Sequence, residues 1–479
     1  MHNNNYSNNN QSFASTNRLQ YESAKITKSC QTAKIFFVDN TKLKGDTFLG
    51  IKTTQSMITY QRHRLDNGLQ VLLHRDDSTP LVTVNLLYNV GARDEDPCRT
   101  GFAHLFEHLM FGGTKAVPDY DMVVNGMGGE SNAFTNNDYT NYYLTVPAQM
   151  LDTALALEAD RMRLLDFSPS RLAVQQQVVT EEYHQRYENQ PYGDTMLLLR
   201  PLCYQRHPYR WPTIGSTIQH VQEATLDDVE QFFFRFYHPA NCILSIAGNI
   251  DYDGALRLVQ RHFADIRPRP EALVDDPQKA MAFARPYPQE ETQDQPRRLE
   301  VQRPVPNDAL YMAFPMCDRN DSDFFVYDLL SDVLSNGNSS RLYRHLVQER
   351  ALFSELNAYI TGEAGPGLFI VSGKPSDGVP LDDAESAVWD ELKCLSDTPV
   401  DSHELQKVVN KFENTFVYSQ YKVMDRAMSL CHYTWLGRTE WVNDEPQSYK
   451  TITPDDLQRV ARQCFVPEHS NILYYHSQQ

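Results

Sequence analysis

The 479-residue sequence lacks a long apolar run. No segment reaches the roughly 18 consecutive apolar residues that a bilayer-spanning helix requires. The N-terminus also lacks the apolar core of about 7 to 15 residues that a secretory signal contains. We therefore expect a soluble protein without a membrane span.

Clustered cysteines and an excess of basic residues are also missing. The eight cysteines are scattered singly along the chain, which predicts reduced thiols, favours a cytoplasmic location and provides no cysteine metal site. Lys and Arg number 44 against 62 Asp and Glu, a formal net charge of −18. This charge disfavours binding to nucleic acid and to anionic membranes. It suits basic or extended cationic peptides as partners, although solubility alone also explains it.

Residues 1–56 differ in composition from the rest of the chain. Residues 1–10 form an Asn-rich, low-complexity tract that cannot bury enough apolar surface to fold. The first 40 residues contain few acidic residues, as organellar presequences do, but they also contain almost no Arg, which argues against one. We interpret residues 1–56 as a low-complexity or poorly ordered extension.

The most informative motif is His-Leu-Phe-Glu-His at residues 104–108. The apolar, β-branched residues 81–88 predict a strand before it, followed by a loop and then a helix that closes at a Gly-Gly pair. On a helix, His104 and His108 lie one turn apart on the same face, with Glu107 beside them. Two imidazoles and one further ligand could hold zinc with an open position for water, and the carboxylate could take that water's proton. Short His/Glu patterns also arise by chance, so the strand-loop-helix context is what favours metal-assisted hydrolysis.

A third metal ligand is expected on a second helix. The Ser-Pro pair at 168–169 is a favourable N-cap and first turn, and residues 171–188 contain neither Gly nor Pro. Within this helix Glu182 shares a face with the apolar pair at 178–179, whereas Glu181 points about 100° away. We therefore select Glu182 as the ligand. The alternative is that both glutamates are ordinary solvated helix charges.

The motif lies within one of several sequence blocks that occur in the same order in a known family. The blocks are residues 90–95, 100–114, 131–135, 178–182, 214–216 and 236–241. On these blocks the chain, from about residue 57 to its end, resembles the pitrilysin and mitochondrial-processing-peptidase family of zinc peptidases, in its shorter two-subunit branch. These peptidases carry the inverted His-x-x-Glu-His motif of the inverzincins.

The resemblance implies a role for individual residues. The zinc ligands of the family map onto His104, His108 and Glu182. The general base of the family maps onto Glu107. The edge strand along which family members pair the backbone of a peptide substrate maps onto Asn132, Ala133 and Phe134.

Two departures from the family pattern bear on function. Family members often have a glutamate seven residues before the third ligand, where this chain has Gln175, which cannot ionise and weakens the expected support of the site. Members that complete the site in one polypeptide carry an Arg and a Tyr after a Ser-Arg-Leu block. Residues 339–343 keep that block, but Val347 and Ser354 occupy the Arg and Tyr positions. In the two-subunit branch a partner subunit carries the Arg and Tyr, so this chain resembles the metal-bearing half.

Length and an internal repeat predict two domains of about 200 residues each. A capping threonine, a proline fourteen residues later and then a strand occur in this order twice, starting at Thr225 and again at Thr453. Convergent helix capping would explain the threonines alone. The identical spacing favours a duplication.

The resulting domain prediction has four parts. They are the extension at 1–56, a zinc-binding peptidase domain at 57–267, a linker at 268–296, and a second peptidase-like domain without the Arg/Tyr pair at 297–479. We expect each domain to be α+β, with an antiparallel or mixed sheet packed against helices. The resemblance implies that the two domains form one half of a clamshell.

The leading functional hypothesis is a zinc endopeptidase subunit that hydrolyses peptides or unfolded segments. A zinc-bound water would attack the carbonyl with Glu107 as general base, and a homologous subunit with the Arg/Tyr pair would complete a heterodimer. One alternative is a non-catalytic assembly subunit, against which the intact motif argues. Another is a zinc hydrolase of a non-peptide substrate, against which the edge-strand residues 132–134 argue.

Overall fold

The computed structural model describes residues 57–267 and 287–478, and the elements named below all lie within Thr59–Gln479. The expected extension at residues 1–56 lies outside the described residues. So do residues 268–286 of the expected linker.

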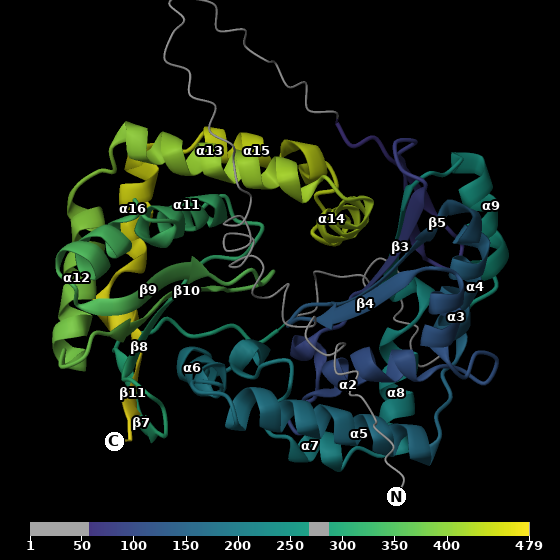
Figure 1. Ribbon diagram of the computed structural model, residues 1–479, viewed down its shortest axis with the longest axis horizontal. Coiled ribbons are helices and arrows are strands. Elements are labelled where there is room, and N and C mark those ends of the chain that lie inside the picture. Colours follow the sequence, from purple (N-terminus) through teal and green to yellow (C-terminus); the bar gives the residue numbers. More distant parts are fainter. Residues whose placement is uncertain (1–56, 268–286, 479) are drawn as a thin grey trace, which may run out of the picture. The chain divides into compact units, whose positions relative to one another are not determined.

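The first half of the described chain builds a six-stranded mixed sheet with the strand order β1-β2-β6-β3-β5-β4. Its strands β3, β4 and β5 are labelled in Figure 1. Its strands are β1 (Gln61–Arg64), β2 (Gln70–Arg75), β3 (Leu81–Tyr88), β4 (Glu130–Thr135), β5 (Thr140–Pro147) and β6 (Cys242–Gly248). Neighbouring strands are antiparallel except β2 and β6, which are parallel. Strand β4 lies at one edge, with β5 as its neighbour.

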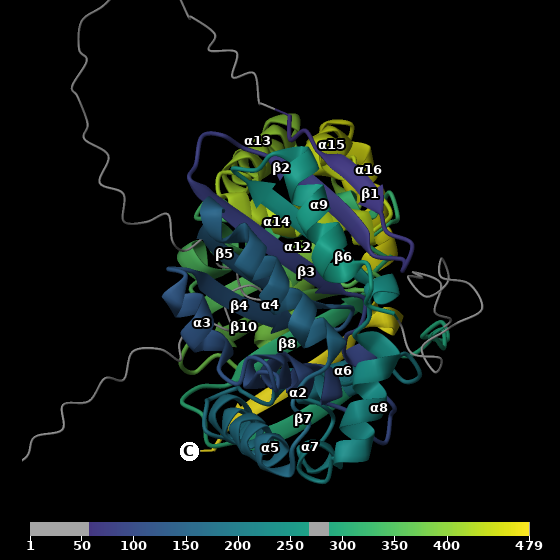
Figure 2. The same ribbon diagram turned by 90° about the vertical axis from the view of Figure 1, so that its right-hand side faces the viewer.

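Eight α-helices accompany this sheet in the described residues of the first half. They are α2 (Phe102–Leu109), α3 (Tyr120–Gly126), α4 (Leu151–Arg163), α5 (Pro169–Tyr183), α6 (Thr195–Cys203), α7 (Gln219–Gln222), α8 (Leu226–Phe236) and α9 (Tyr252–Phe263). Helices α4 and α9 cover one face of the sheet (Figure 2). The predicted strand at 81–88 is confirmed as β3, and the predicted motif helix is confirmed as α2.

The predicted helix after the Ser-Pro pair begins where expected but ends differently. It starts at Pro169, and its last five residues, His184–Glu188, form a π-helical turn. Ser168 occupies the N-cap position with extended backbone, but its hydroxyl makes no capping hydrogen bond. The absence of Gly and Pro therefore predicted that residues 171–188 are helical. It did not predict the change from α-helical to π-helical geometry, which depends on tertiary packing.

The second half builds a five-stranded sheet with the order β7-β11-β8-β10-β9. Its strands are β7 (Arg297–Arg303), β8 (Ala309–Pro315), β9 (Phe353–Ile360), β10 (Leu368–Pro375) and β11 (Asn471–Ser477). Its α-helices are α11 (Phe324–Ser335), α12 (Leu381–Asp397), α13 (Ser402–Ser419), α14 (Val423–Trp435), α15 (Trp441–Lys450) and α16 (Pro454–Cys464).

The two sheets share one topology. The order β2-β6-β3-β5-β4 corresponds strand by strand to β7-β11-β8-β10-β9, and the one parallel pair, β2/β6 or β7/β11, occupies the same place in both. The repeat seen in the sequence has the same structural basis in each half. Thr225 and Thr453 both form capping boxes, at the starts of α8 and α16, and a short 3-10 turn leads from each helix to β6 or β11. The fold is therefore α+β with two related sheets.

Each half contributes one helix to the other half's sheet. Helix α14 packs against β3 and β6, opposite α4 and α9 (Figure 1), whereas α6 packs against β7, β8 and β11. The indole Nε1 of Trp435 on α14 donates to Oδ1 of Asn89 over 2.9 Å, and Leu199 on α6 lies in a core with Leu368 and Leu473. Because helices cover both of its faces, the first sheet buries all of β6 and nearly all of β3.

Candidate metal centre

Helix α2 carries both predicted histidine ligands and the predicted base. Phe102, Leu105 and Phe106 anchor this helix in the first core. The remaining face turns His104 and His108 toward α5, which packs against α2. His104 is buried, and His108 is partly exposed. The sequence periodicity is thus sufficient to orient the motif.

Helix α5 supplies the third predicted ligand. Val179 on this helix is fully buried, Glu181 is exposed to solvent, and the side chain of Glu182 is only 15% exposed. The phase of the helix therefore directs Glu182, rather than Glu181, toward the two histidines. The structure brings His104, His108 and Glu182 together in one cluster.

The distances within the cluster match the requirements of zinc. Nε2 of His104 lies 3.3 Å from Nε2 of His108, and Oε2 of Glu182 lies 3.5 and 3.3 Å from these two nitrogens. A tetrahedral zinc ion with bonds of about 2.0–2.1 Å separates neighbouring ligand atoms by about 3.3 Å. Two imidazole nitrogens and a carboxylate oxygen are also a donor set that catalytic zinc sites use, with a fourth position open. The residues present therefore fit zinc.

The protonation states suit metal binding. Burial lowers the pKa of His104 to about 4, so the imidazole is neutral at physiological pH and its ring nitrogen can act as a ligand. Burial alone would raise the pKa of Glu182, but His104, His108 and Arg186 together lower it to about 2. Of these three groups, Arg186 is the one that carries a permanent positive charge.

Glu107 is buried on α2, next to the cluster. Burial raises the pKa of its carboxyl group, while His108 and the Thr135 hydroxyl on β4 partly oppose that shift. A carboxylate with a raised pKa accepts and releases protons more readily near neutral pH. The contact with Thr135 also places the cluster beside the end of β4.

Residues 132–134 lie on β4, the edge strand. At the hairpin end the N–H of Asn136 donates to the carbonyl of Tyr139 over 3.0 Å, and hydrogen-bonded pairs alternate outward from there. Ala133, opposite Tyr142, thus sits in a non-hydrogen-bonded pair, so its N–H and C=O point away from β5. Its N–H donates to Oδ1 of Asn132 over 2.8 Å.

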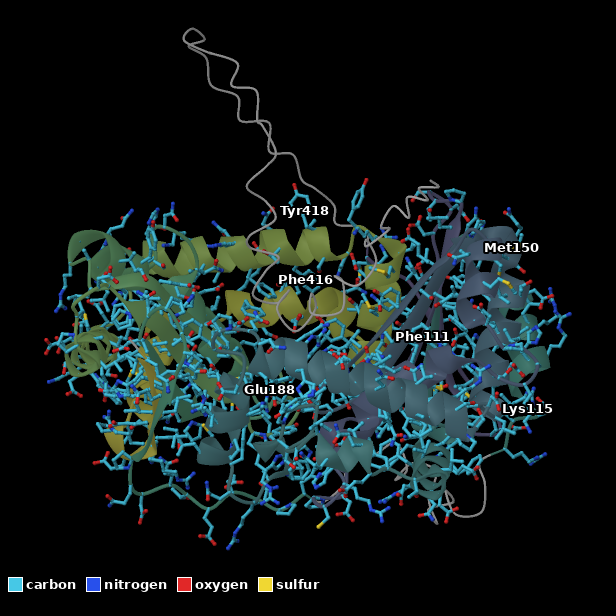
Figure 3. The ribbon with its side chains drawn as sticks, turned by 60° about the horizontal axis from the view of Figure 1, so that its bottom comes forward. Phe111, Lys115, Met150, Glu188, Phe416 and Tyr418 are labelled. Atoms are coloured by element: carbon cyan, nitrogen blue, oxygen red, sulfur yellow. The ribbon has the colours of Figure 1, made fainter. Side chains whose placement is uncertain are left out.

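Sequence reasoning missed Arg186, which forms an ion pair with Oε1 of Glu182 from the π-helical turn. The i, i+4 spacing of this Glu–Arg pair on one helix is the signal that could have identified it. Glu188, which is labelled in Figure 3, ends the same turn. Its side chain is half exposed and pairs with His184. Gln175, at the position of the family's supporting glutamate, is partly buried on α5.

The expected Arg and Tyr positions lie in the second half. Val347 is in a π-helical segment, Tyr343–Glu349, and packs against the second core. Ser354 is exposed on β9, and its hydroxyl donates to the carbonyl of Lys374 over 3.2 Å. Neither side chain supplies a guanidinium or a phenol.

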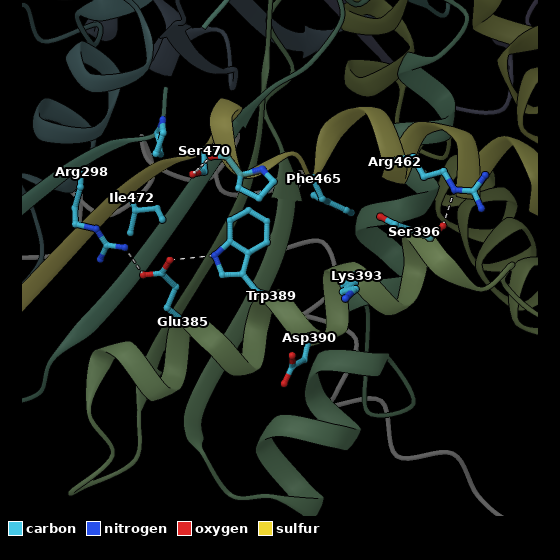
Figure 4. Close-up of a pocket in the computed structure, with 12 residues that line it drawn as sticks. Arg298, Glu385, Trp389, Asp390, Lys393, Ser396, Arg462, Phe465, Ser470 and Ile472 are labelled. Carbon is cyan, nitrogen blue, oxygen red and sulfur yellow. Dashed lines mark hydrogen bonds and ion pairs between the residues drawn. The ribbon is translucent and has the colours of Figure 1, made fainter. Parts of the chain in front are cut away.

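A cavity of about 560 Å³ lies in the second half, between α12, α16 and the β7–β11 edge of its sheet (Figure 4). Arg298 pairs there with Glu385, which also accepts from the indole of Trp389, and Arg462 donates to the carbonyl of Ser396. These polar groups satisfy one another, and no predicted site residue lines the cavity. It is separate from the metal centre.

Family models match both halves of the chain. The model described as "Insulinase (Peptidase family M16)" matches residues 70–210, and the one described as "Peptidase M16 inactive domain" matches residues 223–412. The chain belongs to the M16 peptidase family. The first match contains His104, Glu107, His108 and Glu182.

M16 relatives of similar length carry zinc protease names. The chain is 28% identical to the zinc protease PqqE of Helicobacter pylori over 416 residues, which cover 86% of this chain and 91% of that protein. It is 22% identical to YmxG of Bacillus subtilis, described as an uncharacterised zinc protease, over 86% of this chain and 97% of that protein.

Solved structures of proteases share the fold. A protease from Helicobacter pylori superposes with a TM-score of 0.80 at 27% identity, over 88% of this chain and all of that chain. The periplasmic protease PqqL of Escherichia coli superposes with a TM-score of 0.71 at 20% identity; the match covers 88% of this chain but 48% of PqqL. Within residues 57–267 and 287–478, no helix has the length and apolarity to cross a bilayer.

Proposed function

We propose that this chain is the metal-bearing subunit of a zinc endopeptidase that cleaves extended peptides or unfolded segments. The observation that carries this proposal is the spacing of 3.3 to 3.5 Å among the three ligand atoms of His104, His108 and Glu182. The zinc protease names of the M16 relatives support the same chemistry.

The three ligands would hold zinc with one position open, and zinc there would polarise a peptide carbonyl and acidify a water molecule. Glu107 is the proposed general base. Its buried carboxylate would accept the proton of the attacking water and pass it to the leaving amine. The raised pKa of Glu107 favours both transfers.

The edge strand β4 is the proposed docking site for the substrate backbone. An extended peptide would add to the sheet as a further strand and pair with the outward N–H and C=O of Ala133. To do so, its carbonyl would displace the Asn132 carboxamide from the Ala133 N–H. On β9, the corresponding edge strand of the second half, the hydroxyl of Ser335 already donates to the carbonyl of Ala358 over 2.7 Å. An outward backbone group of each edge strand thus has an internal partner, and β4 is preferred because it contacts α2, the helix of His104 and His108.

A homologous subunit is the proposed partner. Val347 and Ser354 cannot polarise the scissile carbonyl, so the groups that stabilise its developing charge would come from a second chain that carries the Arg/Tyr pair. The alternatives are an assembly role without catalysis and a zinc hydrolase that acts on a non-peptide substrate.

The zinc content of purified variants tests the ligand set. Wild type should bind about one zinc per chain, and His104→Ala, His108→Ala and Glu182→Gln should lose it. Glu107→Gln should keep zinc but abolish the activity of the assembled enzyme, because it removes a base and not a ligand. Glu181→Gln is the matched control and should keep zinc.

Two results would contradict the proposal. Loss of zinc in Glu181→Gln with retention in Glu182→Gln would mean that the wrong carboxylate was selected. Full activity of the complex with Glu107→Gln would support the assembly role instead.

A further inference from the structure

The segment at residues 91–95 lies between β3 and α2. It contacts α2, called the metal helix below because it carries His104 and His108, and it contacts the hairpin that carries β4. Its centre is a 3-10 turn, Ala92–Asp94. The indole of Trp211 donates to the carbonyl of Ala92 over 2.9 Å, and the hydroxyl of Tyr287 donates to Asp94 over 2.7 Å. Hydrogen bonds from residues distant in the sequence therefore fix the position of this segment.

Glu95 caps the metal helix. One carboxylate oxygen accepts from the N–H of Gly101 and the other from the N–H of Ala103, each over 2.8 Å. These donors belong to the N-cap and the first turn of α2, immediately before His104. The two side-chain oxygens of Glu95 thus satisfy N–H groups that the start of a helix leaves unpaired.

Helix α2 has no capping side chain of its own. Its N-cap residue is Gly101, with φ +91°, and a Cβ there would approach the carbonyl oxygen of Ile214 to 2.8 Å. The position thus excludes Ser, Thr, Asp and Asn, the usual capping residues. Glu95, six residues upstream, takes over that task.

The same segment is bonded to the β4–β5 hairpin through Arg93. The N–H of Arg93 donates to the carbonyl of Asn137 over 2.9 Å, and its buried guanidinium donates to Oδ1 of Asp138 over 2.6 Å. A Cβ on Gly91 would come within 2.5 Å of the Asn137 backbone, so the two segments are in close contact. Arg93 therefore holds the hairpin that carries the proposed docking strand, β4, against the segment at residues 91–95.

We propose that Glu95 and Arg93 are positioning residues that set the metal helix and the docking strand relative to each other, Glu95 through α2 and Arg93 through the hairpin. This inference rests on the proposed function of the cluster and of β4. It requires that the two residues act on different steps. Glu95 acts on metal affinity, and Arg93 acts on peptide binding.

Zinc affinity tests the role of Glu95. Glu95→Gln replaces one acceptor oxygen by an amide that cannot accept the backbone N–H. Its Kd for zinc, measured by chelator competition, should rise about 10- to 100-fold, as is typical when a group that supports a metal ligand is lost. The absorption spectrum of the Co²⁺-loaded variant should also change. Glu290→Gln is the matched control, because Glu290 accepts the N–H groups of residues 205–207 in a loop that does not belong to α2.

Peptide affinity tests the role of Arg93. In a zinc-loaded Glu107→Gln background, Arg93→Gln should raise the Kd for a fluorescent unstructured peptide about tenfold and leave the zinc Kd unchanged. Arg319→Gln is the matched control, since Arg319 forms an equally buried ion pair with Glu445 in the second half. It should lose stability without changing either Kd.

Three outcomes would overturn the inference. They are equal zinc affinities in Glu95→Gln and Glu290→Gln, equal peptide affinities in Arg93→Gln and Arg319→Gln, and a change of both affinities in each variant. If a glutamine variant does not fold, Glu95→Asp and Arg93→Lys replace it, and wild-type values in both would also overturn the inference. A wild-type chain that binds no zinc would defeat the proposed function as well, which separates the two failures.

Discussion

Arg161 on α4 is a fully buried cation in the first core. Its guanidinium pairs with Glu158 one turn earlier, with Nη2 2.6 Å from Oε2, and stacks over Tyr120 and Tyr142 at 4.7 Å from each ring centroid. The hydroxyl of Tyr120 donates to the other oxygen of Glu158 over 2.8 Å. The guanidinium is therefore buried together with its counter-charge, as a buried charge requires. Within the described residues, its Nη1 makes no hydrogen bond.

Removing one member of this pair should be strongly destabilising. Glu158→Gln leaves the buried guanidinium without a counter-charge and should cost about 3–5 kcal/mol of unfolding free energy, measured by urea denaturation. The double variant Glu158→Gln/Arg161→Met should lose less than the two single losses added together, because it no longer buries an unpaired charge. A cost below about 1 kcal/mol for Glu158→Gln would indicate that water reaches Arg161.

At the scale of elements, β4 is the edge strand that lies next to α2. It is an edge strand with an outward-facing N–H at Ala133, yet the Ala133 side chain is buried, so the strand is held firmly while one side of its backbone remains available. The Asn132 carboxamide covers that N–H. This internal cover also limits strand-to-strand aggregation at the edge.

Ala133→Pro should weaken peptide binding without affecting zinc. Proline removes the outward N–H but no hydrogen bond of the β4–β5 ladder, so an edge strand tolerates it. The Kd for an extended peptide should rise at least tenfold, while the zinc content stays at the wild-type level. Ala358→Pro on β9 is the matched control, because its N–H also points away from the sheet. Unchanged peptide affinity in Ala133→Pro would remove β4 from the binding site.

At the scale of the whole molecule, the two halves have related sheets but differ in the functional side chains that they hold. The first half brings together the metal cluster, whereas Val347 and Ser354 in the second half offer neither a cation nor a phenol. Helices α6 and α14, each packed on the other half's sheet, tie the halves into one unit. The proposed catalytic complement would come from a second chain.

The isolated chain should bind zinc but cleave an unstructured peptide slowly or not at all. Addition of a homologous subunit that carries the Arg/Tyr pair should raise the rate by about 10²- to 10³-fold, the usual value of a group that stabilises an oxyanion. Initial rates with and without the partner measure this effect. Full activity of the chain alone, abolished by Glu107→Gln, would contradict the two-subunit proposal.

The sequence by itself determined the features that depend on local periodicity and capping. The apolar pattern at 81–88 predicted β3, the His-x-x-Glu-His spacing predicted the helical face of α2, and the repeated threonine caps predicted related α8 and α16. Helix phase also separated Glu182 from Glu181. These features involve residues a few positions apart, so one turn of helix or one strand is enough to specify them.

Tertiary structure alone decided the features that join distant residues. The distance between α2 and α5, the edge position of β4 and the exchange of α6 and α14 between the sheets all depend on how elements pack, and no local pattern encodes packing. Glu95 shows this at the scale of one residue. It is an ordinary loop glutamate in the sequence, and it becomes the cap of the metal helix because Gly101, held against Ile214, cannot carry a capping side chain.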